Sequence, residues 1–193
     1  RAFGYQPSDY VIPDNVLPTQ NGTDFSYMFT GSQMITMPLF DTSNGRTFGS
    51  MFESCTNITT IPLYNTTNAS DCALMFSGCT KLENVPALDM SKNTTFYYMF
   101  YFCESLKKAP DFDTSNGNNF NYMFAYCSSL EEASGLNTSK GNNFSNMFYN
   151  DSKLVTIDTI DLISNTGSLS NLFGSCSSLE YLIIKNINKN LSL

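Results

Sequence analysis

The residues best suited to chemistry in this chain are its six cysteines, because thiols can form disulfides, bind zinc or act as nucleophiles. Five of them recur at one position of a repeat and the sixth stands alone: Cys55, Cys79, Cys103, Cys127 and Cys176, then Cys72. The chain contains no histidine and no Cys-x-x-Cys pair, which disfavours zinc and leaves no base to activate a nucleophile. Stacked repeats would bring successive thiols within disulfide distance, but pointing the same way. We therefore expect free, buried thiols that pack as small hydrophobic groups.

A second recurring position holds oxygen-bearing side chains that could bind Ca²⁺. These are Asp41, Asn65, Asp89, Asp113, Asn137 and Asp161. No second carboxylate recurs in the repeat, and Thr and Ser usually follow, so an Asx turn is the favoured interpretation and calcium the alternative. With no Gly-rich phosphate loop and no isolated pair of acids, we expect no catalytic residues, no metal and no cofactor.

A third group is aromatic and confined to the middle of the chain. The candidate partner-binding residues are Tyr97, Tyr98, Tyr101, Phe102, Tyr122, Tyr126 and Tyr149. They occupy positions that are predicted to face outward or flank the core. Apart from Tyr27 and Leu74, the other repeats hold small or polar residues there. Clustered exposed aromatics suggest a surface for a sugar ring or a protein partner. The alternative is that they pack against one another along the molecule.

The element that must position these residues is a repeat of about 24 residues, marked by Met-Phe. Its methionines are Met28, Met51, Met75, Met99, Met123 and Met147, and Leu172-Phe173 follows. An aromatic or apolar residue three positions before Met and a Cys four positions after it give the spacing i, i+3, i+4, i+7, which predicts a short helix. Apolar residues ending at Pro predict a short strand, and sequences such as DTSNG predict a turn.

The predicted fold class is therefore a leucine-rich-repeat-type solenoid of about seven coils, each containing a short helix, a short strand and a turn. Residues 1–24 are the predicted N-terminal cap, 25–182 the repeats and 183–193 the closing segment. The residues expected in or beside the core are Met28, Phe52, Phe76, Phe100, Phe124 and Phe148.

Glycine recurs in the turn, where it can adopt positive φ. Gly22, Gly45, Gly117 and Gly141 share this position. Ala69 takes it in the third coil, so that coil is expected to turn differently.

Residues 113–133, DTSNGNNFNYMFAYCSSLEEA, resemble the leucine-rich repeats of BspA-like bacterial surface proteins, with their DTSN and MFxxCxxL signatures. The similarity covers about residues 16–182. It implies surface display and recognition, as in adhesins, mycoplasma lipoproteins and receptor-binding proteins of phage tails, and it supplies no catalytic residues. Ser32 and Asp151 stand where the family pattern has Cys.

The charge of the chain disfavours some classes of partner, because the net charge is −7 with only ten Lys and Arg. Nucleic acid and anionic membranes would be repelled, and no apolar stretch is long enough to span a membrane. We expect a non-enzymatic recognition or adhesion module, located extracellularly, on a cell surface or on a virion, that binds a protein or carbohydrate on a cell surface. The alternative is a structural or decoration component of a phage tail or fibre or of another surface assembly, incorporated into a larger particle.

Overall fold

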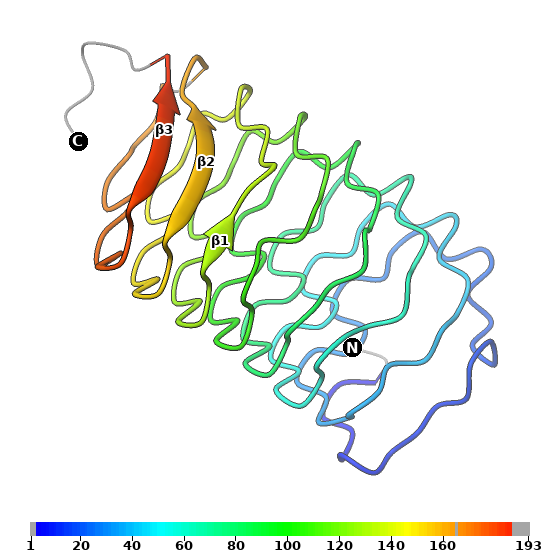
Figure 1. The fold of residues 1–193 in the computed structure, drawn as a ribbon. Helices are drawn as coiled ribbons and strands as arrows, with labels where there is room; N and C mark the ends of the chain where they lie inside the picture. The colour runs from blue at the N-terminus through cyan, green and yellow to red at the C-terminus, as the bar shows by residue number, and fades with distance from the viewer. Residues whose placement is uncertain (1–2, 165, 187–193) are drawn as a thin grey trace.

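The chain winds back beside itself about every 24 residues, and successive windings lie side by side along one axis (Figure 1). The computed structural model describes residues 3–164 and 166–186. Main-chain hydrogen bonds join equivalent positions of neighbouring windings: the Phe76 amide donates to Met99 O at 3.0 Å, and the Phe100 amide donates to Met123 O at 2.8 Å. We name each winding by the methionine of its Met-Phe pair, from the Met28 winding to the Met147 winding, with the Leu172 winding last.

The predicted fold class, a leucine-rich-repeat-type solenoid with helix, strand and turn in each coil, is wrong. The described residues contain no helix and only three short strands: β1 (Glu132–Ala133), β2 (Thr156–Asp161) and β3 (Tyr181–Lys185). They form one parallel sheet in the order β1-β2-β3, on one face near the C-terminal end (Figure 1). Elsewhere the windings meet through isolated parallel bridges.

Tight turns replace the expected helix. In the Met51 winding the Met51 amide donates to Phe48 O at 3.1 Å and the Cys55 amide donates to Phe52 O at 3.0 Å. Ser50 and Ser54, the third residues of these two turns, have φ of 56° and 60°, as type II turns require. The Phe52 amide then points sideways to Met75 O, 2.9 Å away, rather than along its own segment. Two such turns also return side chains to one face at intervals of three and four residues, so they reproduce the helical spacing.

The core is a column of phenylalanine rings that runs along the axis. Stacked in order are Phe29, Phe52, Phe76, Phe100, Phe124 and Phe148, all completely buried. Neighbouring centroids lie 5.3 to 5.7 Å apart with interplanar angles of 2° to 11°. The prediction that Phe52, Phe76, Phe100, Phe124 and Phe148 lie in or beside the core is confirmed, and Met28 packs against the core as predicted.

The recurring glycine of the turn has a steric role that differs from the predicted one. Gly45, Gly117 and Gly141 do not have positive φ. A methyl group on Gly117 would lie 2.6 Å from the Phe120 ring, and the equivalent rings of Phe48 and Phe144 crowd Gly45 and Gly141. Ala69 is tolerated where Cys72 replaces that Phe, and its amide donates to Thr66 O at 2.8 Å, as in the neighbouring turns. The expectation of a different turn there is wrong.

Parts of the predicted cap and closing segment lie outside the described residues. Of the closing segment 183–193, residues 183–185 belong to β3, and 187–193 lie outside the described residues, as do residues 1 and 2 of the cap.

Candidate functional site

The seven aromatic residues singled out above come together in one continuous cluster, which we call the aromatic surface. Tyr98 and Tyr122 of adjacent windings stack with centroids 4.5 Å apart, and Phe102 and Tyr126 stack at 4.4 Å with an interplanar angle of 3°. Tyr101 lies between the two stacks and meets Phe102, Tyr122 and Tyr126 edge-on. Tyr97 contacts Tyr98, and Tyr149 meets Tyr126 edge-on.

The turn backbone sets the direction of these rings. Tyr98, Phe102, Tyr122 and Tyr126 all have φ between 54° and 64°, in the left-handed region. This conformation costs a non-glycine residue about 1–2 kcal/mol. The amides of Tyr98 and Phe102 donate to Asn121 O and Ala125 O of the next winding, both at 3.0 Å. These bonds fix the distance between windings, and the rings at equivalent positions are therefore close enough to stack.

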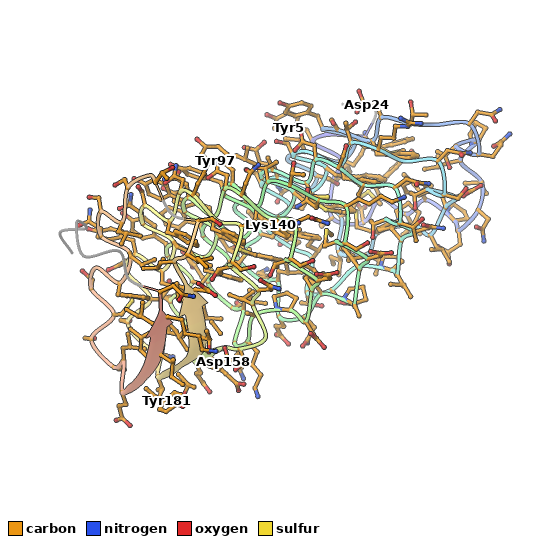
Figure 2. All side chains as sticks on the ribbon, turned by 90° about the horizontal axis from the view of Figure 1, so that it is seen from above. Tyr5, Asp24, Tyr97, Lys140, Asp158 and Tyr181 are labelled. Carbon is orange, nitrogen blue, oxygen red and sulfur yellow. The ribbon has the colours of Figure 1, made fainter. Side chains whose placement is uncertain are left out.

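The aromatic surface is partly exposed. Tyr97 is 37% exposed, and the other six rings are half-buried. Burial, with the neighbouring tyrosines Tyr97, Tyr122 and Tyr101, raises the pKa of Tyr98 to about 12. Figure 2 shows Tyr97 and Asp24 along one edge of the molecule, and Asp158 and Tyr181 along the opposite edge. The aromatic surface therefore lies on the side away from β2 and β3.

Because the inner rings stack on one another, the cluster presents mainly ring edges and hydroxyls. The rings therefore pack against one another along the molecule, as in the alternative predicted from the sequence. A surface of this kind suits a partner that lies across it.

The cysteines are free in the structure, and five of them share one interaction. The thiols of Cys55, Cys79, Cys103, Cys127 and Cys176 donate to a Phe carbonyl of the preceding winding, at 2.9 to 3.2 Å. Burial raises the pKa of Cys103 and its neighbours Cys79 and Cys127 well above that of a free thiol. These are structural groups rather than nucleophiles, because the thiolate is the reactive form.

Asp151 occupies the cysteine position of the Met147 winding and is completely buried. Its Oδ1 accepts a hydrogen bond from the Cys127 amide at 2.8 Å, whereas Oδ2 has no partner within the described part of the chain. Burial raises the pKa of this carboxyl to about 8. The sequence marked Asp151 as a departure from the repeat but gave no measure of its burial.

The turn acids form Asx turns. Oδ1 of Asp41, Asp89 and Asp113 accepts the amide of the residue two positions on, at 2.9 to 3.0 Å. Together with the serine hydroxyls, these amides lower the pKa of all three carboxyls. Over residues 3–164 and 166–186 there is no cluster of His, Cys, Asp and Glu suited to a metal ion, and no helix long and apolar enough to cross a membrane.

Sequence reasoning missed a cavity of about 370 Å³ on the sheet side, lined by residues 83–85 and 106–110. It lies between the Met75 and Met99 windings. Two departures from the repeat, Cys72 and Asn93, were the available signals that this junction differs from its neighbours.

Comparison with known proteins gives one family. The family described as "Mycoplasma protein of unknown function, DUF285" matches residues 15–111 and again residues 84–187, so the two matches together span most of the chain. No curated protein matches. No solved structure matches either.

Proposed function

Because the chain belongs to the DUF285 family, a BspA-like repeat family of unknown function, we propose that it is a non-enzymatic recognition module displayed on a surface. Its partner is a protein or glycan on a cell surface, and it binds through the aromatic surface. The family supports the repeat character and the surface setting. The choice of site rests on one observation about this chain.

That observation is the uneven distribution of aromatics over equivalent positions. Immediately before Met the windings hold Tyr27, Ser50, Leu74, Tyr98, Tyr122 and Asn146, with Asn171 before Leu172. All seven of these residues have φ between 52° and 60°, so the same turn forms with Ser, Leu or Asn. Winding geometry therefore does not require Tyr, and three successive windings nevertheless concentrate seven large rings on one side. Tyrosine offers large contact area with few rotatable bonds, which is why it is enriched in binding hot spots.

The test is the double variant Tyr98→Ala/Tyr122→Ala, assayed against a panel of candidate host cells and immobilised glycans. We expect binding to weaken by at least ~2 kcal/mol, the loss typical of a hot spot. Tyr27→Ala is the matched control, because Tyr27 has the same turn position and a φ of 60° but lies outside the cluster.

Unchanged binding by the double variant, with the fold intact by thermal melting, would place the site elsewhere. Unfolding of the double variant alone would show that the rings serve packing. A wild-type protein that bound only the particle carrying it, and no cell or glycan, would instead identify a decoration component.

A further inference from the structure

The junction between the Met75 and Met99 windings differs from its neighbours on the sheet side. At the other junctions from the Met51 winding onward, the residue that follows the buried Leu donates its amide to the equivalent carbonyl of the preceding winding. These bonds are Glu83 to Thr59 O, Glu131 to Lys107 O, Val155 to Glu131 O and Glu180 to Val155 O, at 2.8 to 3.0 Å. The equivalent amide of Lys107 makes no such bond to Glu83 O among the described residues, nor does the amide of Lys108.

The same junction also differs next to the turn, although its core is closed: the Phe76 amide donates to Met99 O at 3.0 Å, and the Phe76 and Phe100 rings stack with centroids 5.3 Å apart. The Cys72 amide bonds to Asn93 Oδ1 at 3.1 Å, and Asn93 Nδ2 donates to Thr95 O at 2.8 Å. The Asn93 side chain thus bridges the Cys72 amide and the Thr95 carbonyl. At the next junction the equivalent groups bond directly, because the Phe96 amide donates to Asn119 O at 2.8 Å.

At the turn, the Thr94 amide lies 3.5 Å from Ser70 O, whereas the next junction has 2.9 Å between the Asn118 amide and Thr94 O. The two windings are therefore farther apart at the turn and on the sheet side, where the cavity of about 370 Å³ lies between residues 83–85 and 106–110.

The walls of this cavity carry unpaired main-chain groups and two cations. Within the described chain the amides of Val85, Lys107 and Lys108 and the carbonyl of Glu83 have no hydrogen-bond partner. Lys108 forms an ion pair with Glu132 at 2.7 Å, and Lys107 has no ion-pair partner in the part of the chain that the structure describes. Such groups gain free energy when a ligand supplies the missing hydrogen bonds.

We propose that this cavity is a docking site for an extended acidic peptide segment, held by main-chain hydrogen bonds to the separated windings. The opposite edge of the Lys107 segment shows the pairing: the Glu131 amide donates to Lys107 O at 2.8 Å, the Ala109 amide donates to Glu132 O at 3.0 Å, and Lys108 pairs with Glu132. A peptide in the cavity makes the same kind of strand addition on the other edge. No aromatic ring lines the cavity to stack on a sugar. Lys108 already pairs with Glu132, and Lys107, which has no ion-pair partner within the described residues, favours an acidic segment. The proposal is independent of the aromatic surface.

The probe is a capped synthetic peptide with the sequence of residues 128–134, Ser-Ser-Leu-Glu-Glu-Ala-Ser. Added to the full chain, it is expected to bind saturably and to shift the amide NMR signals of Val85, Lys107 and Lys108. Lys107→Ala is expected to weaken binding about tenfold. Lys153→Ala is the matched control, because it removes an exposed lysine away from the cavity. The same peptide N-methylated at alternate amides should also bind at least about tenfold more weakly, since it cannot donate those hydrogen bonds.

Absence of saturable binding at millimolar peptide would overturn the proposal. So would binding that is insensitive to both N-methylation and Lys107→Ala. Shifts confined to Tyr98, Tyr101 and Tyr122 would also overturn it while supporting the aromatic surface, so the two sites are tested separately.

Discussion

Asp151 replaces a thiol with a carboxyl at a fully buried position, and the replacement has a cost that depends on pH. The carboxyl keeps its proton in the folded chain up to a pKa of about 8, whereas an unfolded Asp loses it near ~4. Between these values the unfolded chain is ionised and the folded chain is not. The protonated Asp151 therefore makes its full contribution to the free energy of unfolding below about pH 4. This free energy falls by roughly 1.4 kcal/mol per pH unit as the pH rises towards 8.

We therefore predict that the urea midpoint of the wild-type chain rises on acidification from about pH 8 to pH 5. Asp151→Cys, which restores the residue of the other windings, should remove this dependence and stabilise the protein at pH 8. Asp151→Asn tests the charge alone. Asp41, Asp89 and Asp113 have lowered pKa values, and their contribution is lost only below about pH 4, outside this window. An equal pH slope in wild type and Asp151→Cys would refute the assignment.

The recurring local structure of each winding is a pair of tight turns, each with a residue whose φ lies in the left-handed region. Fifteen non-glycine residues in the described part of the chain have positive φ, among them Leu74, Tyr98 and Phe102. Gly78 has φ of 74° at the position that Phe102 fills in the next winding, and a methyl group there would meet Ser54 only at ordinary contact distance. The cost of a side chain at this position is thus almost purely conformational.

Gly78→Ala is expected to destabilise the fold by ~1 kcal/mol, the cost of the left-handed conformation. Gly49→Ala is the matched control: it lies in the preceding winding, lacks positive φ, and has room for a methyl group. It should be neutral or stabilise by up to ~1 kcal/mol, because the unfolded chain loses freedom. Thermal melts of both variants decide the matter. Equal effects would mean that the turns do not have the backbone described.

The same turns explain which features could be predicted from the sequence. The burial of Phe52 and Phe100 follows from spacing alone, because any local structure that returns every three or four residues buries the same set. Spacing does not distinguish a helix from consecutive turns, since the difference lies in the φ of residues such as Ser50 and Ser54, which have no special propensity. The aromatic candidates were found by comparing equivalent positions. Their packing against one another was the alternative that the sequence offered, but the geometry of the stacking depends on that unpredicted backbone and could not be foreseen.

Over the whole molecule, each winding is held mainly by its two neighbours, so local stability is expected to vary along the axis. The recurring cysteines Cys55, Cys79, Cys103, Cys127 and Cys176 form a column of thiols along the axis, with one thiol in each winding from Cys55 to Cys127. The reactivity of each thiol can therefore be used to measure the local stability of its own winding. Cys176 is half-buried in the last winding, while Cys79, Cys103 and Cys127 are completely buried. Because a thiol reacts only when its winding opens, labelling rates measure opening winding by winding.

We predict that iodoacetamide labels Cys176 first in the native protein, and Cys103 and Cys127 much later, as followed by peptide mass spectrometry. Reducing agent should leave the melting temperature unchanged, because none of the cysteines forms a disulfide. In denaturant all six should react at similar rates. Simultaneous labelling of the five column thiols under native conditions would show that the molecule opens as one unit.

The hydrogen bonds between windings also determine how the chain can fold. Each of them joins positions that are only about 24 residues apart, such as Phe76 and Met99 or Phe100 and Met123. The loop-closure entropy lost on adding a winding is therefore nearly the same at every level, and does not grow with the length of the chain. The first two windings to associate form the costly nucleus, and later windings then add to an existing edge. The folding rate is consequently set by the nucleus, and an array with more windings would fold with a similar barrier.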